Sequence, residues 1–309
     1  MIQVENLRKS FGSTRAVDGI SFTVKEGEIY GLLGPNGAGK TTTISCISGL
    51  LKPEGGRVEI DRADVASEPL RARRSLGVVP QETAIYDTLS ARENVAYFAS
   101  LHGLAGAEQR RRVDEALRRV GLAADSRQSS KKFSGGMKRR LNLAIGLVSH
   151  PKALLLDEPT VGIDPQARIH ILDVVREVQR EGTAILYTTH YLEEAEALCD
   201  RVWIMDHGRI LAEGTIADLR RLVGDGTLVN LRGRFQADAL STVISANANV
   251  RVVSLEDDAA MLAVAGEQRA ASEVLSSVLR AGLEVTEISM QEPSLQSVFI
   301  KLTGRELRD

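Results

Sequence analysis

The segment Gly34-Pro35-Asn36-Gly37-Ala38-Gly39-Lys40-Thr41 decides the fold. It fits the pattern G-x4-G-K-[ST], and it lies between an apolar run at 28–33 and a helix-like segment that begins near Lys40. Glycines let a loop curl so that its N–H groups converge on phosphate oxygens, and the following helix start adds partial positive charge. We expect Lys40 to reach the outer phosphates, Thr41 to ligate Mg²⁺ and Thr42 to bind an inner phosphate. The expected nucleotide-binding residues are Gly34, Pro35, Asn36, Gly37, Ala38, Gly39, Lys40, Thr41 and Thr42.

A pair of carboxylates follows a second apolar run, in Leu154-Leu155-Leu156-Asp157-Glu158. Because the strand ends here, the loop can turn both side chains toward a nucleotide. Asp157 suits holding Mg²⁺, and Glu158 suits polarising an attacking water. The chain contains no Asn-Lys pair, which disfavours a guanine-reading site.

Composition excludes several classes of protein. The 309 residues carry 39 Lys and Arg against 41 Asp and Glu, a net charge of −2, so a globally basic nucleic-acid binder is disfavoured. No run approaches the roughly 20 apolar residues of a membrane span, and no signal peptide is visible. The two cysteines, Cys46 and Cys199, match no metal-binding spacing and are expected to be packing residues.

The pattern of segments predicts two domains. Alternating strand-like and helix-like segments over 1–223 indicate an α/β domain, with a helical insertion at about 87–150 that opens on the capping box at Ser90-Ala91-Arg92-Glu93. Gly224-Asp225-Gly226 marks a boundary, and 226–309 reads as a small α+β accessory domain. The strands expected there are 227–231, 251–255, 261–264 and 284–289, with helices near Glu267 to Leu279 and after Pro293.

At residues 1 to about 220 the chain resembles the ATP-binding cassette (ABC) ATPases, a family of P-loop NTPases. Five further features, in the family's order, carry the resemblance: Phe11 as the adenine-stacking aromatic, Gln81 as the glutamine-loop residue, Phe133-Ser134-Gly135-Gly136-Met137 as the signature, Gly162-Ile163-Asp164 as the D-loop, and His190 as the switch histidine. Phe133 and Met137 depart from the family's LSGGQ, whereas Ser134, Gly135 and Gly136 keep the anion-binding part of the motif.

The resemblance implies an ATPase that uses ATP and Mg²⁺. The expected catalytic residues are Glu158, His190, Gln81 and Lys40; the expected ATP-binding residues add Phe11, Ser134, Gly135 and Gly136 to the loop; and the expected metal ligands are Thr41, Gln81 and Asp157. In the family two cassettes pair head to tail, so each nucleotide lies between one phosphate loop and the opposite signature. A homodimer or a heterodimer with a paralogue is therefore expected.

The resemblance also implies a membrane partner and a location in the cell. The chain is expected to be cytoplasmic and peripheral on the inner face of the cell membrane, and to drive transport through separate subunits. The segment after Gln81 is where related proteins receive the transporter's coupling helix. It contains Tyr86, Tyr97 and Phe98. The alternative for Tyr97 and Phe98 is that they fill the core of the helical insertion.

The C-terminal sequence favours export. The ending Glu292-Pro293-Ser294-Leu295-Gln296-Ser297-Val298-Phe299, followed by Lys301-Leu302-Thr303-Gly304-Arg305-Glu306, resembles the daunorubicin and multidrug-resistance type of exporter ATPase. Those proteins work with membrane permeases of the ABC-2 class. The alternative is that 226–309 forms a generic dimerisation or stabilising domain.

A different class of function is a soluble ABC ATPase that acts on nucleic acid or ribosomes. Eleven basic residues stand against three acidic ones between residues 110 and 140, which could hold RNA, DNA or anionic lipid, or form a solvated helical face. We expect the solvated face and no stable nucleic-acid partner. A small-molecule kinase is weaker still, because it leaves Ser134-Gly135-Gly136 unexplained.

Overall fold

The structure, a computed structural model, describes residues 1–224, 226–234, 237–245, 247, 249–256, 258–265 and 268–303. The chain divides into two compact units, Met1–Leu211 and Ala212–Asp309. This division falls before helix α8 (Ile216–Val223), whereas the sequence patterns suggested a boundary after it. Asp225, Glu267 and 304–309, which entered the sequence-based predictions, lie outside the described residues.

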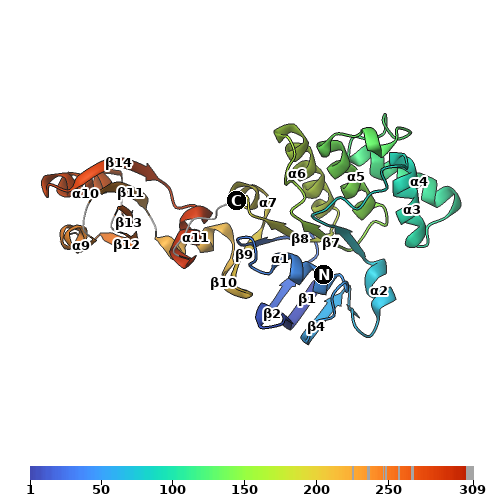
Figure 1. The fold of residues 1–309 in the computed structure, drawn as a ribbon, viewed down its shortest axis with the longest axis horizontal. Helices are drawn as coiled ribbons and strands as arrows, with labels where there is room; N and C mark the ends of the chain where they lie inside the picture. The colour runs from blue at the N-terminus through green and yellow to red at the C-terminus, as the bar shows by residue number, and fades with distance from the viewer. Residues whose placement is uncertain are drawn as a thin grey trace. The chain divides into compact units, whose positions relative to one another are not determined.

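A mostly parallel sheet organises the first unit (Figure 1), with strand order β10-β9-β3-β8-β7-β6. Its central strands β3 (Ile29–Leu33), β7 (Ala153–Asp157) and β8 (Ala184–Thr189) are buried at every residue, as expected for strands covered on both faces. They pair in parallel, so their carboxyl ends lie at one edge of the sheet. The loop after β3, Glu158 after β7 and His190 after β8 therefore emerge side by side.

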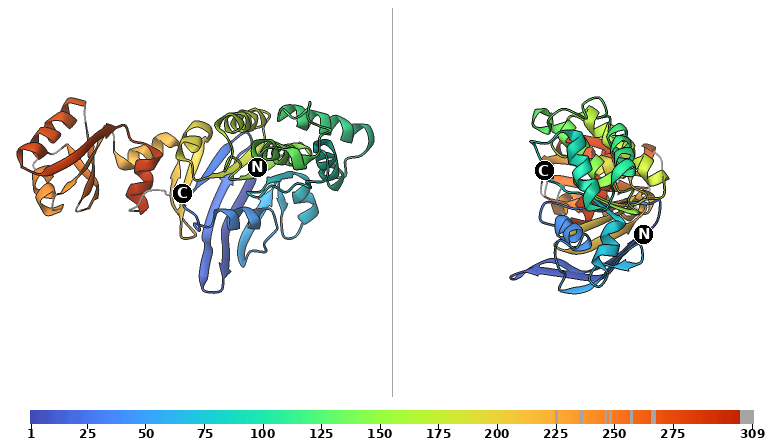
Figure 2. Two further views of the ribbon diagram at one scale, coloured as in Figure 1. Left: turned by 45° about the horizontal axis from the view of Figure 1, so that its top comes forward. Right: turned by 90° about the vertical axis from the view of Figure 1, so that its right-hand side faces the viewer.

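A second sheet packs against this one. An antiparallel sheet of order β2-β1-β4-β5 lies on one side with helix α1, and one hydrophobic core joins it to the parallel sheet (Figures 1 and 2). Trp203 lies in that core, its ring centroid 3.8 Å from that of Phe22. The other elements of this unit and its margin are β1 (Ile2–Phe11), β2 (Thr14–Val24), α1 (Lys40–Ile47), β4 (Gly55–Ile60), β5 (Ala63–Asp64), α2 (Pro69–Arg74), β6 (Leu76–Val79), α6 (Pro165–Arg180), α7 (Leu192–Leu198), β9 (Arg201–Asp206) and β10 (Arg209–Gly214).

The helical insertion has the predicted character. It contains α3 (Ala91–Leu101), α4 (Gly106–Arg119), the 3-10 turn η1 (Ser130–Lys132) and α5 (Gly135–Leu147), with no strand among residues 87–150. The capping box is confirmed, because the Ser90 hydroxyl accepts from the Glu93 N–H and the Glu93 carboxylate accepts from the Ser90 N–H. Asn94, fully buried in α3, accepts from the Tyr86 N–H at 2.8 Å and fixes the preceding loop.

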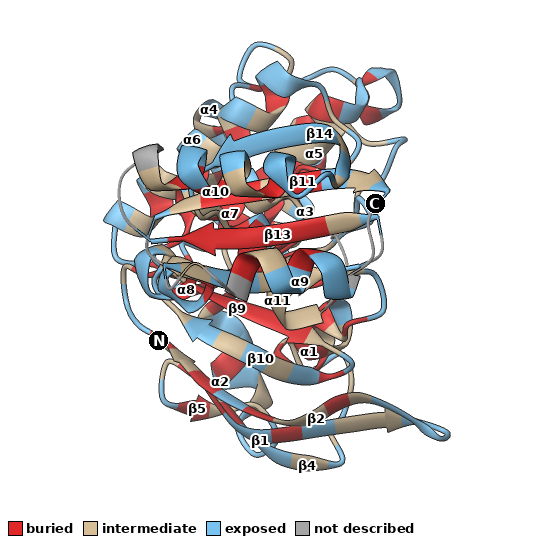
Figure 3. Ribbon diagram, turned by 90° about the vertical axis from the view of Figure 1, so that its left-hand side faces the viewer, coloured by how far each residue is buried: buried red, intermediate tan, exposed pale blue. Residues whose placement is uncertain are grey.

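The second unit contains a β-α-β-β-α-β sequence of elements around an antiparallel sheet of order β12-β13-β11-β14. Its strands are β11 (Thr227–Arg234), β12 (Val250–Leu255), β13 (Ala259–Val264) and β14 (Glu284–Gln291), and its helices are α9 (Ala237–Ser245), α10 (Gln268–Arg280) and α11 (Leu295–Thr303). Helix α9 was not foreseen. Central β13 is largely buried and edge strand β14 largely exposed (Figure 3). The α+β class of this region is thus confirmed.

Candidate active site

The loop after β3 has a shape that only glycine permits at two of its positions. A Cβ at Gly34 would lie 2.4 Å from the Met205 carbonyl oxygen, and one at Gly39 would lie 2.1 Å from that of Ala16. Gly39 also has a φ of 109° and precedes α1 without any side-chain cap. The loop and the uncapped helix start therefore present backbone N–H groups to one point, which suits an anion.

Lys40 lies across this loop. Its ammonium group donates to the carbonyl oxygens of Gly34 at 2.8 Å and Pro35 at 3.3 Å, and it pairs with a Glu158 carboxylate oxygen at 3.2 Å. The side chains of Lys40 and Glu158 are each only 5% exposed. A cation held so far from water beside a nest of N–H groups fits the charge of a polyphosphate.

Glu158 is the point on which the predicted catalytic residues converge. One of its carboxylate oxygens contacts Lys40, and the other accepts from the Gln81 amide at 3.2 Å and lies 3.3 Å from Nδ1 of His190. Its φ of 46° is unusual for a side chain with a Cβ, and backbone strain of this kind collects at functional sites. Two contacts hold the strained turn: the Glu158 N–H donates to the hydroxyl and to the carbonyl oxygen of Thr188.

Asp157 and Thr41 form the neighbouring part of the site. Burial raises the pKa of Asp157, while hydrogen bonds from Thr188 and Thr41 oppose the rise. Thr188 donates to the Asp157 carboxylate at 2.6 Å. A hydroxyl and a carboxylate beside a phosphate loop are the oxygen ligands that Mg²⁺ takes together with substrate phosphates. The residues present therefore fit Mg²⁺, although no cluster of three His, Cys, Asp or Glu is found among the described residues.

The signature residues begin another helix. Ser134 caps α5 and accepts from the Met137 N–H at 3.2 Å, and both Ser134 and Gly135 are exposed. Phe133 is buried, which explains why an apolar residue other than Leu is tolerated there. Among the described residues, the hydrogen bonds and ion pairs of Lys40 and Glu158 involve none of Ser134, Gly135 and Gly136.

Phe11 lies apart from these groups, at the end of β1. Its ring is 52% exposed and has the Lys9 ammonium 5.5 Å from its centre. An exposed ring of this kind is available to stack on a base.

Comparisons with known proteins show which families and proteins this chain is similar to. Residues 17–161 match the family model described as ABC transporter, and residues 214–303 match the C-terminal domain of DrrA1-3-like ATP-binding proteins. The chain is 40% identical to the linearmycin resistance ATP-binding protein LnrL of Bacillus subtilis, covering 100% of both chains. It is 38% identical to the daunorubicin resistance ATP-binding protein DrrA3 of Streptomyces coeruleorubidus, covering 99% of this chain and 97% of that protein.

The chain belongs to the ABC transporter family. The solved ATP-binding subunit of an ABC transporter superposes with a TM-score of 0.67 at 33% identity, covering 72% of this chain and 92% of that one. A dimeric ATP-binding cassette with ADP and Pi gives 0.64 at 27% identity, covering 70% and 98%. The predicted P-loop NTPase fold of the ABC type is confirmed, and the chain is the ATP-hydrolysing subunit of an ABC exporter.

Two buried polar residues beside the site of the ABC cassette, Thr188 and Glu194, were not singled out by the motifs. The Thr188 hydroxyl donates to the Asp157 carboxylate and accepts from the backbone N–H of Glu158. It stands inside the quoted strand exit before His190, so its position was visible although its role was not. Glu194 lies four residues after His190 and is buried, and no sequence signal distinguished it from the exposed acids around it.

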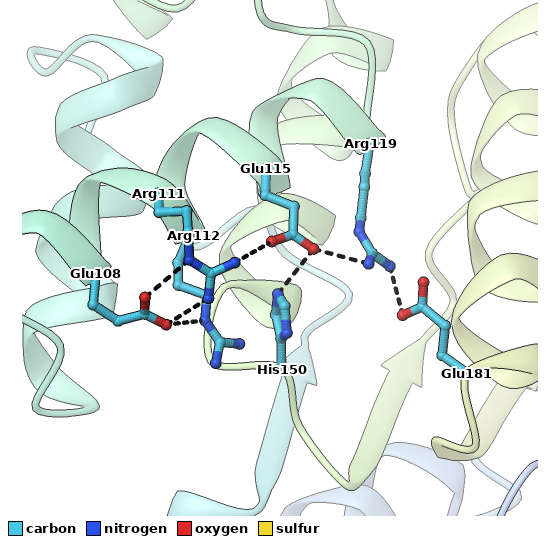
Figure 4. Close-up of polar contacts among 7 residues, drawn as sticks. All are labelled: Glu108, Arg111, Arg112, Glu115, Arg119, His150 and Glu181. Carbon is cyan, nitrogen blue, oxygen red and sulfur yellow. Dashed lines mark hydrogen bonds and ion pairs between the residues drawn. The ribbon is translucent and has the colours of Figure 1, made fainter.

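Four of the eleven basic residues of the helical insertion, Arg111, Arg112, Arg119 and Lys138, pair with carboxylates within the ABC ATPase. Arginines of α4 pair with glutamates along the helix and at its neighbours (Figure 4), and the hydrogen bonds from Arg111 and Arg112 lower the pKa of Glu108 to about 2. The pairs are Arg111–Glu108, Arg112–Glu108, Arg119–Glu115, Arg119–Glu181, Arg92–Asp114 and Lys138–Asp87. These pairs are typical of a solvated helical face, which stays the prediction for this cluster. None of the helices in the described part of the chain is long and apolar enough to cross a membrane.

Proposed function

We propose that this ABC ATPase hydrolyses Mg-ATP at the cluster centred on Glu158. The observation that carries the proposal is the convergence of Lys40, Gln81 and His190 on that one carboxylate, within 3.2 to 3.3 Å. A buried carboxylate beside a phosphate loop is suited to orient and polarise an attacking water. His190 and Gln81 then hold the carboxylate and the water in line.

Lys40 also controls whether the Glu158 carboxylate is available as a base. In the structure it pairs with Glu158, and a polyphosphate offers it a stronger partner at the same place. When Lys40 turns to the outer phosphates, the Glu158 carboxylate is released to act as a base. Thr41, Gln81 and Asp157 would hold Mg²⁺, which supplies positive charge that stabilises the developing negative charge on the phosphates.

The remaining ATP contacts come from a second cassette. Ser134, Gly135 and Gly136 stand at the start of α5 without hydrogen bonds to Lys40 or Glu158. Ser134 and Gly135 are exposed, so this helix start is available to the nucleotide of another copy. Their N–H groups and the helix dipole attract the γ-phosphate. Two copies, or one copy and a paralogue, would enclose two ATP molecules, with Phe11 stacking on each adenine. The dimeric state of a solved relative supports this arrangement.

The ATPase would drive export through separate permease subunits of the ABC-2 class and lie on the inner face of the membrane. Relatives named for drug resistance and for Nod factor export support this direction. Tyr86, Tyr97 and Phe98 form a ring cluster with centroids 5.2 to 6.3 Å apart, and Tyr86 and Tyr97 are 48% and 43% exposed. Tyr86 and Tyr97 therefore lie at the surface, whereas Phe98 is half-buried. A hollow of about 290 Å³ beside Phe98 would receive the permease.

ATPase activity with and without the co-expressed permease tests the proposal. Glu158→Gln should bind ATP and lose at least about 100-fold in kcat, as expected for removal of a general base. Tyr97→Ala should keep the basal rate and lose stimulation by the permease. Leu50→Ala, which removes an exposed apolar side chain elsewhere, should keep both. Turnover by Glu158→Gln at the parent rate would contradict the assigned chemistry.

A further inference from the structure

Glu194 is a buried carboxylate with no part in the proposed chemistry. It lies in the first turn of α7 and is 4% exposed. One of its oxygens accepts three hydroxyl hydrogen bonds, from Tyr187 at 2.8 Å, Thr160 at 2.9 Å and Thr189 at 3.1 Å. The other lies 3.3 Å from Nε of Arg168. A carboxylate taken out of water is retained only with such compensation, so this group fixes the positions of the three hydroxyls. Its second oxygen and Arg168 Nε are within ion-pair distance but do not form a hydrogen bond.

Two of these partners, Thr160 and Thr189, come from the segments that border the catalytic cluster. Thr160 lies in the turn that follows Glu158, and Thr189 immediately precedes His190. Glu194 therefore ties the turn bearing the proposed base to the turn bearing the switch histidine. The Thr189 hydroxyl also accepts from the Tyr191 N–H at 2.9 Å, which fixes the backbone on the far side of His190.

Arg168 reaches His190 through one aromatic ring. Its guanidinium lies over the Tyr191 ring, 4.4 Å from the centroid, and the centroids of Tyr191 and His190 are 4.3 Å apart. A planar guanidinium stacked on an aromatic ring and paired with a buried carboxylate resists displacement. Movement of Arg168 would therefore move the ring against which His190 packs.

Arg168 is also linked by contacts to the start of α5, the helix that begins at the signature residues. It lies near the N-terminus of α6, where its N–H donates to the carbonyl oxygen of Asp164 at 3.0 Å. Gly136 packs against the same helix end: a Cβ there would lie 2.8 Å from the Ala167 Cβ and 3.1 Å from an Asp164 carboxylate oxygen. A hollow of about 340 Å³ opens beside this contact, lined by Met137, Arg140 and His170 among others. The direct contact at Gly136 is therefore the point at which a shift of α5 would pass to the start of α6.

We propose that Arg168 and Glu194 are positioning residues that set His190 according to whether the signature end of α5 is engaged. The contacts run from Gly136 to the start of α6, then through Arg168 and Tyr191 to His190. In a dimer, contact of one chain's signature residues with the opposite nucleotide would then change the position of His190 in the ATP site of the same chain. The inference rests on the proposed function, since it assigns regulation to that site.

Steady-state ATPase kinetics of the full chain with its permease tests the path. Arg168→Met and Glu194→Gln should lower kcat by about 10- to 100-fold, the range expected when a catalytic group is misplaced by about 1 Å, with KM for ATP within about twofold of the parent. Arg168→Lys keeps the charge without the planar stack and should recover part of the rate. Arg176→Met is the matched control, because Arg176 lies on the same helix and donates to the Ala197 carbonyl oxygen away from His190. It should keep the parent kcat.

Thermal unfolding separates positioning from folding. Arg168→Met and Arg176→Met should lower the melting temperature to a similar extent, so that only the kcat distinguishes them. If Arg168→Met and Arg168→Lys both keep the parent kcat, or if Arg176→Met loses as much, the path is refuted and the proposed function stands. If the parent itself hydrolyses no ATP with its permease, the proposed function fails instead. Should Glu194→Gln not fold, Arg168→Met, Arg168→Lys and Arg176→Met still decide the outcome.

Discussion

Replacing Glu158 by Gln should lower the stability of the nucleotide-free protein and raise its affinity for nucleotide. The Lys40 ammonium and the Glu158 carboxylate are each 5% exposed and lie 3.2 Å apart. Removing the carboxylate charge leaves a buried cation that keeps only the Gly34 and Pro35 carbonyl oxygens and the new amide oxygen. Complete loss of a buried partner costs about 3–5 kcal/mol, and the remaining acceptors reduce this to about 2 kcal/mol.

This loss has two measurable consequences. For a unit of this size, about 2 kcal/mol corresponds to a melting temperature lower by about 4–8 °C in the absence of nucleotide. Nucleotide binding in the parent must displace the Lys40–Glu158 pair, whereas the variant has no pair to displace. The affinity of Glu158→Gln for a non-hydrolysable ATP analogue should therefore be up to roughly 30-fold higher.

Scanning calorimetry with and without the analogue, together with titration calorimetry, measures both effects. Glu28→Gln is the matched control, because Glu28 is also buried and pairs with Arg201 at 3.2 Å, away from the phosphate loop. It should lower the melting temperature without changing the shift that the analogue produces. Equal melting temperatures for the parent and Glu158→Gln, with equal analogue affinities, would refute the reasoning about Lys40.

Three further predictions concern other parts of the first unit. Phe11→Ala should weaken ATP binding by about tenfold in a titration, as loss of a base stack does, and Phe11→Trp should restore it. Gly136→Ala should lower the free energy of unfolding by about 1–3 kcal/mol, because its Cβ would lie 2.8 Å from the Ala167 Cβ, while Gly135→Ala should cost less in the same denaturation assay. Burial lowers the pKa of His150 from its ordinary value of 6.5, so the stability it contributes is present above pH 6.5 and lost as pH falls below it. His150→Gln should therefore flatten the fall in unfolding free energy between pH 7 and 5; an unchanged profile would contradict this.

Local patterns predicted the elements that carry the site because each had a short-range cause. The apolar runs before the phosphate loop and before Glu158 became buried parallel strands. Ser134 became the cap of α5. These signals depend only on neighbours in sequence.

The rest depended on tertiary packing. That Glu158 adopts a left-handed backbone and meets Lys40 follows from the pairing of β7 and β8 and not from any local motif. The surface position of Tyr97 and the burial of Glu194 are likewise set by which helix face meets its neighbours. Helix α9 (Ala237–Ser245) follows a polar stretch whose composition gave no start signal.

Association of two cassettes on ATP is the property that a nucleotide enclosed between two copies requires. The Glu158→Gln variant, which binds ATP without consuming it, should sediment as a monomer with ADP and as a dimer with Mg-ATP in analytical ultracentrifugation. Ser134→Ala in the same background should weaken that dimer, since it removes the hydroxyl at the start of α5. A molecular mass of one chain with Mg-ATP, at all concentrations and also beside the permease, would contradict a nucleotide enclosed between two copies.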